Sequence, residues 1–495
     1  MKFFLMKNRT FIITLLLLGF LIGIGINDMG QTSFIRTTLS GLTLGALFFM
    51  VASGLTLVFG LMDVLNFAHG ATFMLGAYMG WQFYTNPTFL FGIAPLVLAL
   101  ITGISASGFV KTWVIRWKIP ENKQSIVQKG IIFSGVIFFM VGVWGLDILG
   151  LANTAMVAIS VTMDPLAELS AQEPFGLFWF RPLFMLIAGL MLAVAMARPG
   201  DKTQSVTKDA RKKGWVNLIV MIIITIIFSL FREKGAEATL LMNANLRFFL
   251  SLIIGSLIGA GFGVAMEVSL IRPLYVRPMY QVLVTLGIAF VIKELIQLLW
   301  QPLAYQMSRP PLFSQPGKAE NLLAWFSSNN TTVDILGVTF PSYRLFIIFL
   351  GVLMFIGLAI LMKYTRFGMI VRAGVQDSQM VEALGINVKK VFTTVFALGA
   401  GLAALGGIGA APFIPVQPNM GDVFQLQSFI VVVIGGMGSY VGAGVGALLL
   451  GMARAFGDFL ALKYSLSPAI SEASTVIIMV IVLLVRPSGL FGKKE

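Results

Sequence analysis

The stretch GLTLGALFFMVASGLTLVFGLMDVLNFAHGATFMLGAY, residues 41–78, decides the fold class of this protein. It consists of two apolar runs separated at residues 65–70 by LNFAHG, which contains His69, the single histidine of the chain. Asn66 and Gly70 stand close to that histidine. An apolar run of about 20 residues has the length that an α-helix needs to cross a bilayer. Polar groups and a glycine between two such runs indicate a helix that is broken within the membrane.

The composition of the chain also indicates an integral membrane protein. Of the 495 residues, 57% are hydrophobic and 11% are charged, whereas a soluble domain carries roughly 25% charged residues. Because open strand edges have no partners in lipid, we expect an all-α polytopic fold. Thirteen segments are candidate spans: 11–27, 39–60, 70–85, 91–114, 131–150, 182–198, 215–231, 247–269, 280–300, 343–362, 391–411, 426–452 and 473–485. The first is interpreted as a retained helix, because no clear small-residue cleavage site follows it.

The basic residues are distributed as a topology signal. The chain has 35 lysine and arginine residues against 21 aspartate and glutamate residues, which gives a net charge of +14. With the N-terminus placed in the cytoplasm, most basic residues fall in the tails and loops of that side, including 116–129 and 198–213. This is the positive-inside pattern. The charge therefore predicts contact with membrane lipid and two cytoplasmic termini, and it gives no support for a nucleic-acid partner.

Two cytoplasmic termini require an even number of crossings, so one of the thirteen segments must enter the membrane and return. We expect this to be 426–452, because a cluster of small residues interrupts it: Gly435, Gly436, Gly438 and Ser439. Non-helical backbone at membrane depth is tolerated only where protein or a water-filled cavity covers its polar groups. We therefore predict that this break, and the break at Asn66, His69 and Gly70, line a translocation path.

Ionisable side chains in apolar segments are functional candidates, since their insertion costs about 2.5–3.5 kcal/mol. We expect His69, one helical turn from Asn66, to hydrogen-bond backbone groups at the break, with substrate contact as the alternative. Glu267 lies near the cytoplasmic end of its span, and we expect it to snorkel to the surface. Lys293 and Glu294 are adjacent and should face different sides of a helix. The remaining candidates are Asp63 and Asp147.

The sequence gives little support to an enzyme. It has no cysteine, which excludes disulfides and thiolate chemistry, and one histidine cannot form a multi-histidine metal site. The patterns GxxxxGK[ST], HExxH and GxSxG are absent. We therefore predict no catalytic residues, no metal and no cofactor, and we expect ATP to be bound by other chains.

The longest polar cytoplasmic segment that is not a simple run of charges lies at residues 363–390. Within it GVQDSQMVEAL, residues 374–384, can form a short amphipathic helix, and Gly385 suits its C-terminal cap. A short helix held between two spans has the usual form of a docking element, and an ordinary amphipathic connector is the alternative.

These residues resemble the permease subunits of branched-chain amino-acid ABC importers, specifically the type that carries NFAHG. The resemblance covers residues 40–90 and 247–495. It rests on the opening stretch, on RPLYVRP (272–278), on TRFGMIVRAGVQDSQMVEALGINV (365–388), on VVVIGGMGSYVGAGVGALLLG (431–451) and on RPSGLFG (486–492).

The resemblance implies an ABC importer permease bundle with broken or re-entrant helices, located in the inner membrane of a prokaryote. It implies three kinds of partner: a second permease, as a heterodimer or alternatively a homodimer; two ATP-binding-cassette ATPases; and an extracytoplasmic solute-binding protein. Five residues resemble the segment that couples such permeases to their ATPases: Glu382, Ala383, Gly385, Ile386 and Asn387.

The chain departs from the family pattern by an insertion. We expect residues 1–90 and 247–495 to form the permease core, the latter with the coupling loop 363–390. Residues 91–246 are expected to be an inserted helical segment with four spans. Four is an even number, so the insertion preserves the orientation of everything that follows it.

The expected function is therefore membrane translocation of branched-chain amino acids delivered by a binding protein. One alternative is the same machinery acting on urea, short amides or other small solutes. A second, of a different class, is a stand-alone secondary transporter or channel that uses His69, Lys293 and Glu294 for ion coupling.

Overall fold

The computed structural model describes Gly19 and residues 29–492, apart from 63–64, 115–116, 118, 147, 149–151, 153–174, 198–207, 276, 377 and 468. The predicted first span, 11–27, lies outside the described residues except for Gly19, and so do Asp63 and Asp147. The chain divides into two compact units. The first consists of Met1–Tyr84 and Asn243–Glu495, and the second of Thr85–Met242.

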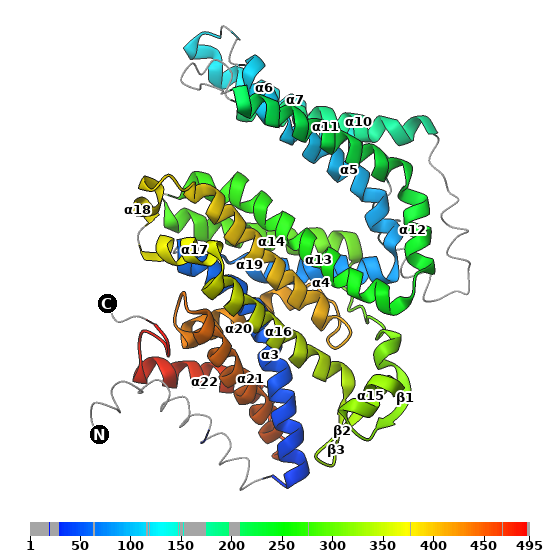
Figure 1. Ribbon diagram of the computed structural model, residues 1–495, viewed down its shortest axis with the longest axis vertical. Coiled ribbons are helices and arrows are strands. Elements are labelled where there is room, and N and C mark those ends of the chain that lie inside the picture. Colours follow the sequence, from blue (N-terminus) through cyan, green and yellow to red (C-terminus); the bar gives the residue numbers. More distant parts are fainter. Residues whose placement is uncertain are drawn as a thin grey trace. The chain divides into compact units, whose positions relative to one another are not determined.

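The first unit is a bundle of long helices (Figure 1). In chain order these are α3 (Gln31–Met62), α4 (His69–Thr85), α13 (Ala244–Met266), α14 (Pro278–Trp300), α16 (Ser342–Tyr364), α19 (Val388–Ala410), α20 (Met420–Gly435), α21 (Tyr440–Lys463) and α22 (Ala469–Val485). Two short helices, α17 (Arg366–Gln376) and α18 (Ser378–Ala383), join α16 to α19. A π-turn (Glu267–Ile271) and a 3-10 turn (Arg272–Leu274) extend α13.

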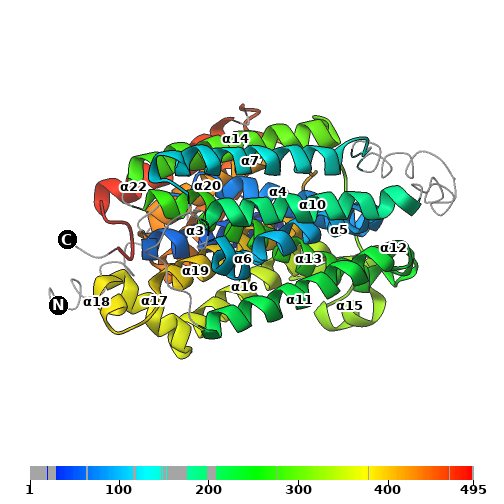
Figure 2. The same ribbon diagram turned by 90° about the horizontal axis from the view of Figure 1, so that it is seen from above.

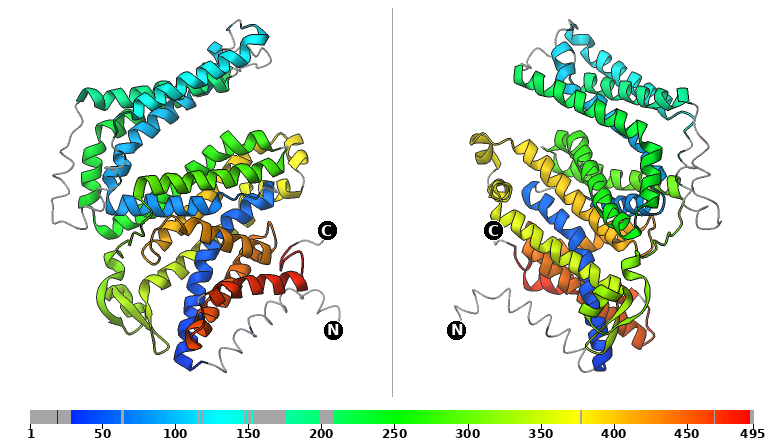
Figure 3. Two further views of the ribbon diagram at one scale, coloured as in Figure 1. Left: turned by 180° about the vertical axis from the view of Figure 1, so that it is seen from behind. Right: turned by 45° about the vertical axis from the view of Figure 1, so that its right-hand side comes forward.

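Helix α3 lies in the core of this unit. Its residues Leu47 to Val58 are all buried, and α16, α19, α20 and α21 pack around it. Figure 3 shows α21 beside it. Glycines allow these contacts: a Cβ atom added to Gly54 would lie 2.2 Å from the carbonyl oxygen of Gly399, and one on Gly451 would lie 2.3 Å from the amide nitrogen of Gly45. A helix that is apolar on every side is suited to such a central position.

The two ends of this bundle differ. At one end, residues 311–341 form a small cap with a 3-10 turn (Pro311–Phe313), the helix α15 (Leu322–Ser328) and a three-stranded sheet. Its strands are β1 (Gln315–Ala319), β2 (Asn330–Ile335) and β3 (Val338–Pro341); β1 pairs with β2 in parallel, and β2 pairs with β3 antiparallel. The opposite end carries α17, where Gly374 approaches Leu61 of α3.

The second unit is helical. It contains α5 (Pro87–Ser105), α6 (Ser107–Val114), α7 (Glu121–Val143), α10 (Phe175–Met196), α11 (Lys208–Leu230) and α12 (Arg232–Leu241). Helix α10 packs along α5 and α7 (Figure 2). A Cβ atom on Gly189 would lie 2.2 Å from the carbonyl oxygen of Leu100, so backbone meets backbone at the crossing of α5 and α10. The pair α11–α12 is bent by 64°.

The predicted spans from residue 39 onward coincide with helices, but two of the predicted segments, 91–114 and 426–452, are divided. Within the described residues, eight helices are long and apolar enough to cross a membrane, or up to nine if the bent pair counts as one span. The segment 91–114 is broken at Ala106. In the predicted helix 374–384, α17 ends at Gln376 and α18 extends from Ser378 to Ala383, and Asp377 lies outside the described residues.

The segment 426–452 stays a predicted re-entrant segment, and its predicted interruption at the glycines is confirmed. It contains the end of α20 and the beginning of α21, and α21 alone has the length of a span. The break has a backbone cause: Gly436 and Gly438 adopt positive φ angles of 95° and 80°, which favour glycine. The side chain of Ser439 then caps α21 by accepting a hydrogen bond from the Gly442 amide at 3.0 Å.

Candidate translocation and coupling sites

The chain leaves the helix between α3 and α4, where the sequence indicates a break. Asn66 stabilises this turn, because its side-chain oxygen accepts a hydrogen bond from the Ala68 amide at 2.9 Å. His69 does not bond to a backbone group of the break through its ring. Its Nε2 lies 2.9 Å from the carbonyl oxygen of Val51 in α3, and the whole side chain is buried. The imidazole therefore ties the first turn of α4 to the middle of α3.

The start of α20 lies against this break. The side-chain oxygen of Gln425 accepts a hydrogen bond from the Gly70 amide at 2.5 Å, and its nitrogen donates to the Asn66 carbonyl at 3.4 Å. A Cβ atom on Gly70 would lie 2.1 Å from the carbonyl oxygen of Gly421. From α14, the hydroxyl of Thr285 accepts a hydrogen bond from the Phe67 amide at 3.2 Å. Two helices, α20 and α14, thus provide partners for the freed backbone of residues 66–70.

The sequence analysis did not predict that α20 lies against this break. The features that could have suggested it were Gln425, a polar side chain in an apolar segment, and three prolines in the irregular stretch before α20: Pro412, Pro415 and Pro418. Prolines interrupt helices, so they could have indicated that α20 begins after a break of its own. The sequence could not show that this break lies beside His69, some 350 residues earlier in the chain (Gly70 and Gln425 differ by 355 positions).

The glycine turn at 436–439 lies elsewhere. A Cβ atom on Gly60, near the end of α3, would be 2.7 Å from the Cα of Gly438. The carbonyl of Gly435 accepts a hydrogen bond from the Phe491 amide at 2.9 Å, so the turn is also held by the C-terminal segment. Gly60 is six residues beyond Gly54, which is beside His69, so the two contacts are about 9 Å apart along α3. The two predicted breaks therefore contact different parts of that helix.

The charged pair predicted on α14 has a partner on another helix. Lys293 forms an ion pair with Asp422 in the first turn of α20, with 2.6 Å between Nζ and Oδ2. Glu294 is exposed on the neighbouring side of α14. The two adjacent side chains thus face different directions, as expected from helix geometry. Within the part of the chain that the structure describes, no group of three or more histidine or acidic side chains could hold a metal ion.

Of the predicted coupling residues, Glu382 and Ala383 lie at the end of α18, and the other three follow it. Glu382, Ala383 and Gly385 are exposed, and Ile386 is half-buried. Gly385 has a φ angle of 81°, and it ends α18 with two hydrogen bonds: its amide donates to the Glu382 carbonyl at 2.9 Å, and the Ile386 amide donates to the Val381 carbonyl at 3.4 Å. This is the pattern of a Schellman cap. It gives the chain a defined reversal directly before α19.

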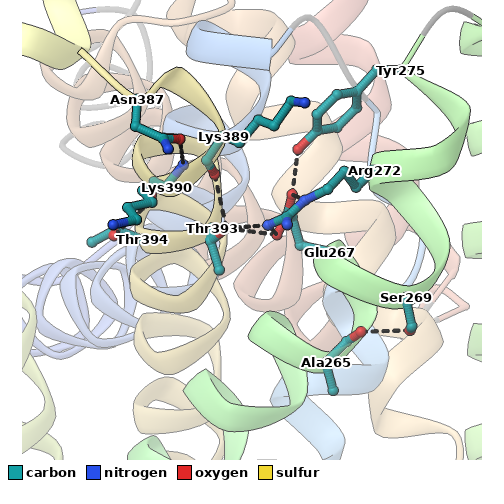
Figure 4. Close-up of polar contacts among 10 residues, drawn as sticks. All are labelled: Ala265, Glu267, Ser269, Arg272, Tyr275, Asn387, Lys389, Lys390, Thr393 and Thr394. Carbon is teal, nitrogen blue, oxygen red and sulfur yellow. Dashed lines mark hydrogen bonds and ion pairs between the residues drawn. The ribbon is translucent and has the colours of Figure 1, made fainter. Parts of the chain in front are cut away.

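Asn387 has a structural role that the sequence did not reveal. It is the N-cap of α19, because its side-chain oxygen accepts a hydrogen bond from the Lys390 amide at 3.1 Å (Figure 4). The exposed part of the segment includes Met380 of α18, which is 59% exposed, and Leu384 directly after α18, which is 72% exposed. Val381, by contrast, is buried and fixes α18 to the bundle.

The prediction that Glu267 snorkels to the surface is wrong. Its side chain is completely buried and binds Arg272 through two contacts, Nε to Oε1 at 3.1 Å and Nη2 to Oε2 at 2.8 Å. The Tyr275 hydroxyl also donates to Oε1, and the Thr393 hydroxyl lies 2.8 Å from Oε2 (Figure 4). Burial, together with the Glu267 carboxylate, raises the pKa of Tyr275, so its hydroxyl stays protonated. The carboxylate is satisfied inside the protein because Thr393 reaches it from α19.

Comparison with known proteins places this architecture in a family. Residues 183–485 match the model of the permease component of the branched-chain amino acid transport system. Among curated relatives, the high-affinity branched-chain amino acid transport system permease protein LivH of Salmonella typhimurium is 33% identical over 171 residues, which are 34% of this chain and 52% of the relative. BraD of Pseudomonas aeruginosa, with the same description, is 32% identical over 161 residues, 32% of this chain and 50% of the relative.

A more distant relative is matched over a longer region. The ribose import permease protein RbsC of Escherichia coli is 26% identical over 307 residues, 57% of this chain and 87% of the relative. No solved structure matches. The chain spans about half the length of LivH and BraD. The family match extends over more than half of the chain. Together with the helical bundle and its candidate spans, it shows that this multi-pass membrane protein belongs to the permease family of branched-chain amino acid ABC importers.

Proposed function

We propose that this protein is the membrane-spanning subunit of an ATP-driven importer of branched-chain amino acids. Two ATPase subunits hydrolyse ATP on separate chains, a second permease completes the pathway, and an extracytoplasmic binding protein delivers the solute. LivH and BraD, whose names describe this transport, support the substrate class. The complex is placed in the inner membrane of a prokaryote, with both termini of this chain in the cytoplasm.

The observation that carries the proposal is the exposed helix α18 between two long apolar helices. Met380, Glu382 and Leu384 are exposed on and directly after it, while Val381 anchors it. A cap at Gly385 and another at Asn387 connect it to α19 with no flexible linker. An ATPase that moves α18 would therefore move α19 as well.

The translocation path is proposed to run beside the break at residues 66–70. There Asn66 and Gly70 bond to Gln425 of α20, and His69 bonds to α3. Broken helices are the usual place for solute sites in transporters. The glycine turn at 436–439 would serve as a second break on the cytoplasmic side of that path, through Gly435, Gly436, Gly438 and Ser439. Movement of α19 against α3 would open the path alternately to the two sides of the membrane.

We propose that residues 91–246 are an insertion into the permease core, as the resemblance implies, and that the second unit, Thr85–Met242, corresponds to it. The family model begins its match at residue 183, inside this unit. The excision experiment described in the Discussion tests the assignment.

The substrate is tested by uptake. Proteoliposomes that contain the complete complex and the binding protein are given labelled leucine, isoleucine, valine, ribose and urea in turn. We expect ATP-dependent uptake of the three branched-chain amino acids. Ribose is included because RbsC is matched over 87% of its length, and uptake of ribose or urea alone would contradict the proposed substrate.

The coupling role is tested by reversing one charge. Glu382→Arg changes an exposed side chain on α18, and we expect it to abolish co-purification of the ATPase subunits and ATP-driven uptake. Glu320→Arg makes the same change at an exposed position at the other end of the bundle and should leave both unchanged. Solute uptake driven by an ion gradient with no ATPase present would show a secondary transporter and would overturn the proposal.

A further inference from the structure

The buried carboxylate of Glu267 connects two spans that are far apart in sequence. Its two oxygens have four donors, namely Arg272 Nε and Tyr275 on Oε1, and Arg272 Nη2 and Thr393 on Oε2. A carboxylate accepts about four hydrogen bonds, so this one is saturated. Arg272 and Tyr275 belong to the same segment as Glu267, directly after α13. Thr393 is the member of this cluster that comes from α19, 126 residues away.

The cluster lies close to the proposed coupling helix. Thr393 is six residues beyond Asn387, the cap of α19, which places it about 9 Å along the helix from that cap. The ring of Tyr275 also meets the ring of Phe392, with 5.5 Å between centroids at an angle of 83°. The second turn of α19 is therefore bound both by hydrogen bonds and by an aromatic contact to the end of α13.

Beyond this cluster, α13 and α19 are packed without room for independent movement. A Cβ atom on Gly263 would lie 2.6 Å from the Cβ of Ala400 and 2.9 Å from the carbonyl oxygen of Phe396. One on Gly259 would lie 2.3 Å from the Cβ of Ala404. Helices whose backbones approach this closely are tightly packed against each other along the contact. The Glu267 cluster completes this contact at the end nearest to α18.

The Thr393 hydroxyl has one proton and two acceptors. Its Oγ1 lies 2.8 Å from Glu267 Oε2 and 2.8 Å from the Lys389 carbonyl oxygen of its own helix, and it accepts a hydrogen bond from Arg272 Nη2 at 2.7 Å. A hydroxyl donates one hydrogen bond at a time. The hydroxyl can therefore donate either to Glu267, which links α19 to the end of α13, or to the Lys389 carbonyl oxygen within α19. Thr394 differs, because its hydroxyl donates to the Lys390 carbonyl oxygen of its own helix at 2.9 Å (Figure 4).

We propose that Glu267, Arg272, Tyr275 and Thr393 form a coupling joint, which transmits the movement of α18 and α19 to the α13 span during transport. The inference rests on the proposed function, because it needs an ATPase that moves α18. The four residues are positioning residues: they contact each other and act on the translocation path through α13. The π-turn at Glu267–Ile271, an element that often marks functional positions in helices, supplies the backbone from which the joint is built.

The test removes one hydroxyl at a time from the full chain in its complex. Thr393→Val keeps the shape of the side chain but removes both the donor to Glu267 and the acceptor for Arg272. Thr394→Val removes the neighbouring hydroxyl, which bonds within α19, and is the matched control. The measured quantities are co-purification of the ATPases, ATP hydrolysis stimulated by the binding protein, and labelled amino-acid uptake per ATP hydrolysed.

We expect Thr393→Val to retain its ATPases and its ATP hydrolysis while uptake per ATP falls about tenfold, a change of the size of one hydrogen bond to a charged group. Thr394→Val should match the wild type. Thr393→Ser, which keeps a hydroxyl, should restore uptake per ATP. If Thr393→Val does not fold, Tyr275→Phe serves as the test variant, with the exposed Tyr280→Phe as its control.

Two results would overturn the joint while leaving the importer function intact: equal uptake per ATP in Thr393→Val and Thr394→Val, or a parallel loss of uptake and hydrolysis in Thr393→Val alone, which would indicate a purely structural contact. A wild-type complex that transports without ATPases would overturn the proposed function itself, and the joint with it.

Discussion

His69 carries its ring proton on Nε2, because that nitrogen lies 2.9 Å from the Val51 carbonyl oxygen, which can only accept a hydrogen bond. Nδ1 has no hydrogen-bond partner among the described residues, and the side chain is completely buried. A Cβ atom on Gly54 would lie 2.8 Å from His69 Cε1, so the ring occupies space that only a glycine leaves open. These contacts favour a structural role over contact with the solute, but the ring bonds to α3 and not, as predicted, to the backbone of the break.

Replacing this side chain gives a prediction at the residue scale. His69→Ala removes one buried hydrogen bond and leaves a cavity between α3 and α4, so we expect the free energy of unfolding to fall by about 2–4 kcal/mol. The thermal unfolding midpoint of the purified protein in detergent measures this loss. A variant with unchanged stability and a much higher KM for uptake would show instead that the imidazole binds the solute.

The burial of Glu267 could not be predicted from its position in the sequence. Its position near the end of a span and close to Arg272 is typical of a charge that reaches the surface. The structure buries it because Thr393 supplies an additional partner from a distant part of the chain. A buried carboxylate needs such partners, since an unpaired one is costly. The sequence could locate the charge, but it could not show the residue that makes its burial possible.

At the scale of the elements, apolar length predicted where most helices lie. The segments 280–300 and 343–362 fall within α14 and α16 almost to the residue. An error occurred where a turn at Ala106 interrupts the apolar run 91–114, because hydropathy does not register a change of direction. Between α20 and α21 the change depends on two positive φ angles, at Gly436 and Gly438.

The crossing of α3 and α19 gives a prediction at this scale. Gly54→Ala would place a methyl group 2.2 Å from the Gly399 carbonyl oxygen, which is backbone and cannot turn aside. We expect a loss of stability of about 1–3 kcal/mol or more, as in other overpacked cores. Gly357→Ala is the matched control on α16, where a Cβ atom meets nothing within 4 Å. That change should stabilise the helix by up to about 1 kcal/mol.

Thermal unfolding of both variants in the same detergent distinguishes the effects. If Gly54→Ala unfolded at the wild-type temperature, α3 and α19 would have to separate at little cost. In that case the glycines of this crossing would serve movement between the helices rather than close packing, which is the alternative that small-residue contacts allow.

At the scale of the whole molecule, the first unit is built from two parts of the chain that meet in space. Tyr84 is its last residue before the second unit, and the guanidinium of Arg247 lies 5.2 Å from the centre of its ring. The ring of Phe248 lies 6.2 Å from the same ring. Because Asn243 is one helical turn before Arg247, both ends of the first unit lie close together where the second unit departs and returns.

This proximity predicts that the second unit can be removed. A chain in which residues 85–242 are replaced by six glycine and serine residues has a linker with a root-mean-square span of about 12–15 Å, enough to join Tyr84 to Asn243. We expect the shortened protein to fold and to retain its ATPases. Size-exclusion chromatography and co-purification measure this result. Aggregation of the shortened chain, with the full chain intact, would contradict the insertion and make residues 85–242 part of one folding unit.

The sequence by itself determined the membrane class, the α-helical fold, the position of most spans and the family, because lipid requires long apolar helices and because the motifs are contiguous. The tertiary structure alone decided which breaks meet and which charges are buried. Gln425 reaches Gly70, Lys293 reaches Asp422 and Thr393 reaches Glu267 across more than a hundred residues each. Such pairings follow from the packing of whole helices, and a local pattern of residues carries no information about the helix that will lie opposite.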